Sequence, residues 1–202
     1  MMKSDRTKLD RKDAILDGVI TLLATQGLEG VTHRKVDECA GLPQGSTTYY
    51  FPRKTALLLA AADHLAALLG KDCDALQVGF AETAARDGLA AAIAYVRDEL
   101  VSYADSARHL FLARVELTMA SSRREDLGGV GDQLTAAARR PIAFFLKLIS
   151  NGKADVPIET CAGLIDGITL MYVTGQGPKP TAEQIAAVFD AILDDSAFKK
   201  KP

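Results

Sequence analysis

Residues 32–54 constrain the fold of this chain more than any other stretch, because they predict two short helices joined by a tight turn. Thr32 is a candidate N-cap, since its hydroxyl can accept a hydrogen bond from a free amide of the first turn. Gly41 follows the expected end of the first helix, where the backbone commonly turns to a positive φ. The next segment, residues 43–50, carries hydroxyls and an amide and no carboxylate, which suits a surface that faces DNA. The pattern is typical of a helix-turn-helix, whose second helix enters the major groove.

Several side chains of this motif are candidates for contacts with DNA. Arg34, Lys54 and the hydroxyl of Tyr49 are placed to bond phosphates, and a phosphate contact is also expected for His33. The candidates for reading base edges are Gln44, Ser46, Thr47 and Thr48. An amide can bond an adenine edge through two hydrogen bonds, and threonine offers a hydroxyl together with a methyl for thymine. The alternative for each is an ordinary helix surface that is solvated or touches only the DNA backbone.

The motif resembles the N-terminal domain of TetR-family transcriptional regulators. The matching residues are Thr32 and Arg34, Ala40-Gly41-Leu42, Gly45-Ser46-Thr47-Thr48-Tyr49-Tyr50-Phe51, and Lys54 with Ala56-Leu57. The resemblance covers about a quarter of the chain, from the first helix at Arg11 to Leu59. It implies that Thr32, Tyr49 and Lys54 face phosphates.

The chain departs from the family pattern at two places in the motif. Pro43 and Gln44 stand where Ser or Thr and Lys are common, and Thr47-Thr48 replaces a common Leu-Tyr. These departures bear on which operator is read. Gly45 lacks a Cβ and so allows close approach to DNA or to the other helix.

The composition predicts an all-α fold for the 202 residues. Ala and Leu are frequent, Trp is absent and β-branched runs are few, which favours helices. Besides the motif, helices are expected over residues 10–26, 53–76, 83–103, 107–121, 132–150, 157–174 and 181–194. We expect a three-helix helix-turn-helix DNA-binding domain over residues 1–52. The resemblance implies a helical ligand-binding and dimerisation domain over residues 53–202. Residues 1–9 are expected to be a mobile arm, and residues 199–202 a disordered tail.

Charge and cysteine usage bound the setting. The net charge is −2, yet residues 1–55 hold nine Lys or Arg against seven Asp or Glu, so the slight positive excess lies where DNA would bind. Cys39, Cys73 and Cys161 are odd in number and widely spaced, which favours a reduced, cytoplasmic setting. The chain has no apolar run long enough for a bilayer and no signal-peptide core, so no membrane is expected.

The sequence lacks the signatures of a catalytic or metal site. His33, His64 and His109 are scattered without metal-ligand spacing. No glycine-rich phosphate loop follows a strand, and no Ser/His/Asp arrangement can be read. We therefore expect no enzyme, no cofactor and no metal.

The second half of the chain suggests an apolar chamber with a few polar groups, the usual make-up of a small-molecule site. The candidates for lining it are His64, Tyr95, Tyr103, Phe111, Arg114, Met119 and Tyr172. The alternative is an ordinary helical core in which a neighbour satisfies His64 and Arg114 extends outward to solvent. The expectation of a pocket rests mainly on the family resemblance.

The last two helices are candidates for a dimer interface. The resemblance implies that they form a four-helix bundle across a twofold axis. The expected interface residues are Cys161, Gly163, Leu164, Gly167, Ile168, Ile185, Val188, Phe189 and Ile192. The alternative places them in the core of their own chain.

We therefore interpret the chain as a homodimeric repressor that binds a pseudo-palindromic DNA operator and is released by an unknown small-molecule effector. Twofold dimers double the few base contacts of one helix-turn-helix on a palindrome. Two alternatives stay open. One is a DNA-binding or architectural protein without a ligand, and the other is a helical small-molecule binding protein whose motif match is false.

Overall fold

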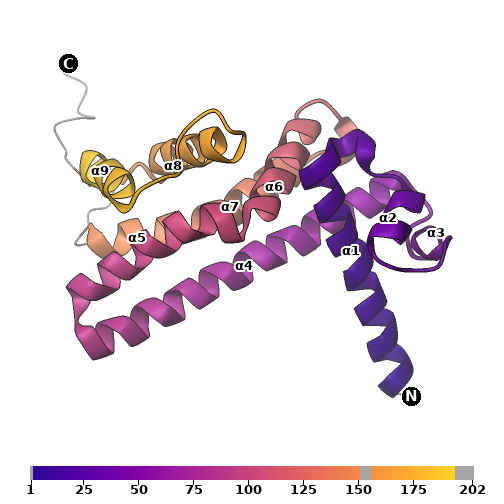
Figure 1. Ribbon diagram of the computed structural model, residues 1–202, viewed down its shortest axis with the longest axis horizontal. Helices are drawn as coiled ribbons and strands as arrows, with labels where there is room; N and C mark the ends of the chain where they lie inside the picture. The colour runs from indigo at the N-terminus through magenta and orange to yellow at the C-terminus, as the bar shows by residue number, and fades with distance from the viewer. Residues whose placement is uncertain (1, 151–155, 194–202) are drawn as a thin grey trace. The chain divides into compact units, whose positions relative to one another are not determined.

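The computed structural model describes residues 2–150 and 156–193, and every regular element in this part of the chain is a helix (Figure 1). The α-helices are α1 (Met2–Gly30), α2 (His33–Cys39), α3 (Ser46–Tyr50), α4 (Lys54–Asp87), α5 (Leu89–Ser106), α6 (Arg108–Ser121), α7 (Val130–Ile149), α8 (Ile158–Val173) and α9 (Ala182–Leu193), with a 3-10 turn at Glu125–Leu127. The predicted all-α fold is confirmed. Among these helices, none is both long and apolar enough to cross a membrane. The predicted tail, residues 199–202, lies outside the described residues.

The chain packs as two compact units. Unit 1 comprises Met1–Leu69 and His109–Ala137, and unit 2 comprises Gly70–Arg108 and Ala138–Pro202. Helices α4 and α7 therefore contribute to both units. The predicted division at residues 52 and 53 separates DNA binding from ligand binding by role, and it stays a prediction.

In unit 1, α1 presents one apolar face to the core. The buried side chains of this face are Ile15, Leu16, Val19, Ile20, Leu22 and Leu23. The prediction of a mobile arm over residues 1–9 is wrong, because α1 begins at Met2 and the backbone from there is helical. The helix breaks at Gly27, where φ is 68°, directly after the end of the helix expected over residues 10–26.

The short helical segment after Gly27 is bonded to two other helices of unit 1. The amide of Leu28 donates to Oε1 of Glu116 on α6 at 2.8 Å. The carbonyl of Leu28 accepts from Nζ of Lys54 on α4 at 3.1 Å. Both backbone hydrogen-bonding groups of Leu28 thus have side-chain partners from outside α1, which ties its end to α4 and α6.

In unit 2, α4 runs through the predicted break near residues 76–83 and ends only at Asp87. Gly88, with φ at 87°, provides the turn into α5. Gly79 does not end the helix, because it serves packing: a Cβ at this position would lie 2.2 Å from the hydroxyl oxygen of Tyr95. The ring of Tyr95 therefore lies against bare backbone, which brings α5 close to α4.

The core of unit 2 is formed by α4, α5, α7, α8 and α9. Its buried side chains include Phe80, Val96, Phe145, Leu146, Cys161, Ile165, Ile185 and Phe189. The rings of Phe145 and Phe189 pack edge to face with centroids 4.6 Å apart. Helix α9 begins with a reciprocal cap, in which the Gln184 amide donates to Thr181 Oγ1 at 3.2 Å and the Thr181 amide donates to Gln184 Oε1 at 3.1 Å.

Candidate nucleic-acid interface

Helix α2 begins and ends as the sequence predicts. The Thr32 hydroxyl accepts from the Lys35 amide at 3.3 Å, so Thr32 is the N-cap. At the other end Gly41 adopts φ of 64°. The amide of Leu42 returns to the Asp37 carbonyl at 2.9 Å and closes the helix. The tight turn of the motif is thereby built from local hydrogen bonds.

The start of α3 is held by a residue that sequence reasoning passed over, Asp37 on α2. Its carboxylate is buried, with 2% of the residue exposed. Oδ2 accepts from the Gly45 amide at 2.7 Å. Oδ1 accepts from both the amide and the hydroxyl of Thr47, at 2.7 and 2.6 Å. Because Gly45 has no side chain of its own to cap α3, a carboxylate from the preceding helix takes that part.

The surroundings of Asp37 favour its charged form. Burial raises the pKa of this carboxyl, but the hydrogen bonds from Thr47 and Gly45, with the nearby His33, outweigh burial and hold the pKa below the ordinary value of 3.8. The carboxylate is therefore ionised at neutral pH, when its three bonds to the start of α3 are strongest.

Acid should weaken this contact. Because the pKa of Asp37 is lower in the folded chain than in the unfolded chain, its contribution is complete above pH 3.8 and is lost as the pH falls through the folded value. We expect Asp37→Asn to lower the free energy of unfolding by about 2 kcal/mol at neutral pH. The difference from wild type should shrink below about pH 4 in urea titrations. A difference that stays constant down to about pH 3 would contradict a charged Asp37.

The base-reading candidates separate into exposed and buried residues. Gln44 and Thr48 are exposed, and Tyr49 is 75% exposed. Thr47 is fully buried and its hydroxyl donates to Asp37, so the prediction that it reads a base is wrong. The hydroxyl of Ser46 is half-buried and donates to the Pro43 carbonyl at 2.6 Å. Gly45 has φ of 92°, which residues with a side chain rarely adopt. The backbone conformation therefore explains a glycine at this position.

Three of the phosphate candidates, Arg34, His33 and Lys54, already have a partner in the chain. Arg34 bonds Glu38 one turn away at 2.9 Å, with both side chains exposed. His33 Nε2 lies 2.7 Å from the Phe51 carbonyl, which ties α2 to the end of α3. Lys54 donates to Leu28, as above. The Arg34–Glu38 ion pair is exposed and contributes little to stability, so Arg34 can exchange the Glu38 carboxylate for a phosphate at small cost.

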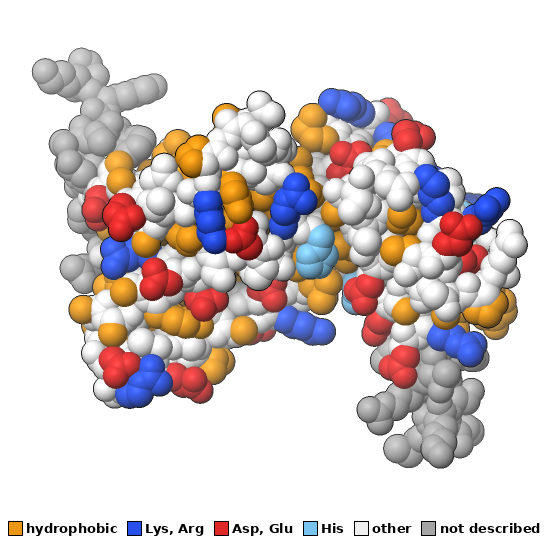
Figure 2. Space-filling view, viewed as in Figure 1, with side chains coloured by type: hydrophobic (Ala, Val, Ile, Leu, Met, Phe, Trp, Pro, Cys, Tyr) orange, Lys and Arg blue, Asp and Glu red, His pale blue; other side chains and the backbone are white. Residues whose placement is uncertain are grey.

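The charge on the surface of this region is mixed. In Figure 2, Lys and Arg side chains alternate with Asp and Glu side chains over the part of unit 1 that holds α1, α2 and α3. Residues 10–54 hold six Lys or Arg and six Asp or Glu, so their formal charges balance. Contacts with phosphates would rest on individual side chains around the motif and on its backbone amides.

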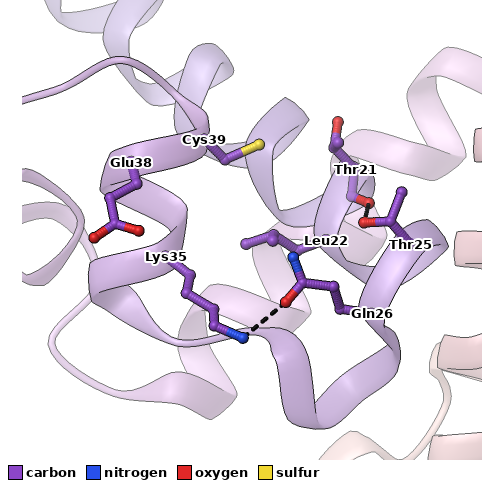
Figure 3. Close-up of a pocket in the computed structure, with 7 residues that line it drawn as sticks. All are labelled: Thr21, Leu22, Thr25, Gln26, Lys35, Glu38 and Cys39. Carbon is purple, nitrogen blue, oxygen red and sulfur yellow. Dashed lines mark hydrogen bonds between the residues drawn. The ribbon is translucent and has the colours of Figure 1, made fainter.

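An open hollow of about 390 Å³ lies between α1 and α2 (Figure 3). It is lined by Thr21, Leu22, Thr25, Gln26, Lys35, Glu38 and Cys39. Lys35 and Gln26 point toward each other across it and are hydrogen-bonded at 2.7 Å. The Thr21 and Thr25 hydroxyls donate to carbonyls of their own helix. The hollow contains no residue of the predicted ligand set, and its charged side chains, Lys35 and Glu38, are bonded to Gln26 and Arg34.

Comparison with known proteins decides the family. The family model described as "Tetracyclin repressor-like, C-terminal domain" matches residues 84–195, more than half of the chain. The chain belongs to the TetR family. It is a helix-turn-helix transcriptional regulator.

Other TetR-family proteins match along almost the whole chain. The HTH-type transcriptional regulator BetI of Brucella anthropi is 29% identical over 188 residues, which cover 90% of this chain and 91% of BetI. A TetR-family structure from Streptomyces coelicolor A3 superposes with a TM-score of 0.65 at 22% identity, covering 90% of this chain and 97% of its own. A regulator from Saccharomonospora viridis in complex with choline gives a TM-score of 0.65 at 16% identity, covering 94% and 97%.

The predicted ligand residues of this TetR-family chain divide between the two units. His64, Phe111, Arg114 and Met119 lie in unit 1, and Tyr95, Tyr103 and Tyr172 lie in unit 2. Arg114 is buried, with its guanidinium 4.8 Å from the Phe111 ring, so it does not extend into solvent. Met119 is exposed, so the prediction that it lines an apolar chamber is corrected. Nε2 of His64 lies 2.8 Å from a carboxylate oxygen of Asp17, as the core alternative expects.

In unit 2 the tyrosines of this set have packing or bonding partners. Tyr95 lies against Gly79, and burial, then Glu99 and Glu82, raise the pKa of its phenol. Tyr172 donates to a carboxylate oxygen of Asp105 at 2.6 Å. The other carboxylate oxygen of Asp105 is paired with Lys179. As ligand contacts these residues remain predictions.

The predicted dimer residues occupy two different faces. Cys161, Ile185, Phe189 and Ile192 are buried in the core of unit 2, so their assignment to an interface is wrong. Burial raises the pKa of Cys161 to about 12. Gly163, Leu164 and Gly167 are exposed, and Ile168 and Val188 are half-buried. A Cβ at Gly163 or Gly167 would meet no described atom within 4 Å.

Proposed function

We propose that this TetR-family regulator is a repressor that binds a pseudo-palindromic operator as a homodimer and is released when a small molecule binds its C-terminal helices. The observation that carries the proposal is the helix-turn-helix, in which a capped turn presents Gln44, Thr48 and Tyr49 to solvent on and beside α3. Operator binding places its action in the cytoplasm, with the DNA.

The exposed side of α8 supports the homodimer. Leu164 is 47% exposed, and Met171, seven residues on, is also exposed. Gly163 and Gly167 lie beside them with free space above their backbone. We call these four residues the open face of α8. Small residues next to apolar ones allow two helices to approach closely, and a twofold axis through this face would cover it with the same face of a second copy.

The contacts of Leu28 support regulation through unit 1. Its backbone amide donates to Glu116 on α6, and its carbonyl accepts from Lys54 on α4. A ligand that binds one position of α6 better than another would therefore also favour one position of the DNA-binding helices. Such release requires a difference in ligand affinity between the two states. Two proteins with a similar fold were solved with small molecules: the Saccharomonospora viridis regulator with choline and the multidrug binding protein EbrR with ethidium. Choline and ethidium are therefore the first probes to add to the operator complex.

DNA binding should weaken as salt rises, because cations are released from phosphates on binding. After operator selection from a random DNA pool, we expect Lys54→Ala to flatten the slope of log affinity against log salt by about one unit. Gln44→Ala is the matched variant: it should reduce affinity for the selected site by about 1–3 kcal/mol and leave the slope unchanged. An unaltered slope in Lys54→Ala would exclude Lys54 from the phosphate contacts.

A further inference from the structure

Asp37 on α2 and Thr47 on α3 form a buried polar pair that the assignment of a DNA-binding motif does not explain. We propose that Asp37 is a positioning residue for operator binding, which holds the turn 43–47 and the start of α3 in the conformation that the DNA requires. The inference rests on the operator binding proposed above. It adds that a residue that does not reach the DNA surface determines how well the exposed side chains read it.

Helix α3 needs an external support because of its length. It has five residues, and a helix of this length does not persist by itself in water. At its two ends, the Tyr49 amide donates to the Gly45 carbonyl at 3.0 Å, and the Phe51 amide donates to the Thr47 carbonyl at 2.8 Å. Asp37 binds three donors at the start of this segment, which is more than any other side chain offers it among the described contacts.

The three donors bracket the residues that face solvent. Gly45 follows Gln44 directly, and Thr47 precedes Thr48 directly. When Asp37 holds the amides of Gly45 and Thr47, it sets the backbone from which Gln44 and Thr48 project. A displacement of about 1 Å in such supports is enough to degrade a binding site. The pair therefore acts on readout through the backbone.

The chemistry of the site calls for a carboxylate. All three groups that face Asp37 are donors, so a pair of oxygen atoms that only accept is matched to them. Asparagine has nearly the same shape but would direct an NH₂ group at one of these donors. Asp37→Asn thus removes the match and keeps the volume.

Charge and position predict opposite results for this variant. A carboxylate near DNA repels phosphates, so electrostatics alone predict that Asp37→Asn binds DNA more tightly. Positioning predicts weaker binding, by about tenfold, for the selected operator. The control is Glu38→Gln, the adjacent residue with the same change of charge, which releases Arg34 from its exposed ion pair. It should bind as tightly as wild type or more so.

The experiment measures operator affinity by fluorescence anisotropy at one salt concentration, together with amide hydrogen exchange by NMR and circular dichroism. We expect Asp37→Asn to remain helical, to bind the operator about tenfold more weakly, and to lose protection at the Gly45 and Thr47 amides. A folded Asp37→Asn that binds as well as wild type would overturn the inference.

A second variant covers the case in which Asp37→Asn does not fold. Thr47→Val keeps the carboxylate and both amide bonds and removes only the buried hydroxyl. We expect about threefold to tenfold weaker operator binding with an unchanged salt slope. Wild-type affinity in this variant would also overturn the inference. If the wild-type protein itself selects no operator, the proposed function fails. Hydrogen exchange at the Gly45 and Thr47 amides still measures whether Asp37 holds the start of α3.

Discussion

Leu164→Glu is expected to convert the protein from dimer to monomer at low concentration and to weaken operator binding with it. Leu164 lies on the open face of α8, so a twofold contact there would place two glutamates against each other in an apolar interface. Like charges brought together in this way cost several kcal/mol, which corresponds to at least about a hundredfold weaker dimerisation. Operator binding should fall because a monomer engages only one half-site. Analytical ultracentrifugation and DNA binding on the same sample measure both effects.

Val78→Glu is the matched control for this substitution. Val78 is 57% exposed on α4, outside the open face of α8, so the same change of side chain there should leave both the dimer and operator binding as in wild type. A Leu164→Glu protein that sediments as a dimer at the lowest concentrations would remove α8 from the interface, and the site of dimerisation would have to be sought on another surface.

Phe189→Ala should have the largest effect on stability. The Phe189 side chain is 2% exposed and packs edge to face on Phe145 with ring centroids 4.6 Å apart. Its removal leaves a cavity in the core of unit 2, and such truncations lower the free energy of unfolding by about 3–5 kcal/mol. Guanidinium unfolding followed by circular dichroism at fixed protein concentration measures this change.

The neighbouring Val188→Ala provides the comparison for Phe189→Ala. Val188 is half-buried on the same helix, so its truncation should cost only about 1 kcal/mol. If Phe189→Ala unfolded like wild type but dissociated more readily, the side chain would belong to the dimer interface that the sequence suggested. The structure predicts the reverse order, because the ring is enclosed by its own chain.

Features that depend on neighbouring residues in the sequence were predicted well. The N-cap at Thr32, the turn at Gly41 and the break at Gly27 are all confirmed, since each depends on local backbone geometry. The start of α9 at Thr181 is confirmed for the same reason. In these cases the residue that decides the conformation and the backbone that adopts it are at most a few positions apart.

Features that depend on contacts across the fold were missed or misplaced. A carboxylate inside α2 carries no sign of a partner ten residues further on, so Asp37 was passed over and Thr47 was assigned to DNA. The break between α4 and α5 was expected too early, near residues 76–83, whereas α4 continues to Asp87. Gly79 lies in this stretch without ending the helix, because the ring of Tyr95 packs against its backbone. Only the packed structure reveals this contact.

The sequence by itself determined the all-helical fold, the helix-turn-helix and the family to which the chain belongs, because these follow from helix periodicity and from a motif of short range. Only the tertiary structure decided which side of each C-terminal helix is used. Periodicity shows that α8 has apolar residues, but it does not say what covers them. The structure buries Cys161 in the core of unit 2 and leaves Leu164, three residues later, open to solvent. The difference arises because burial is settled by the helices that pack against a face, and those helices come from distant parts of the chain.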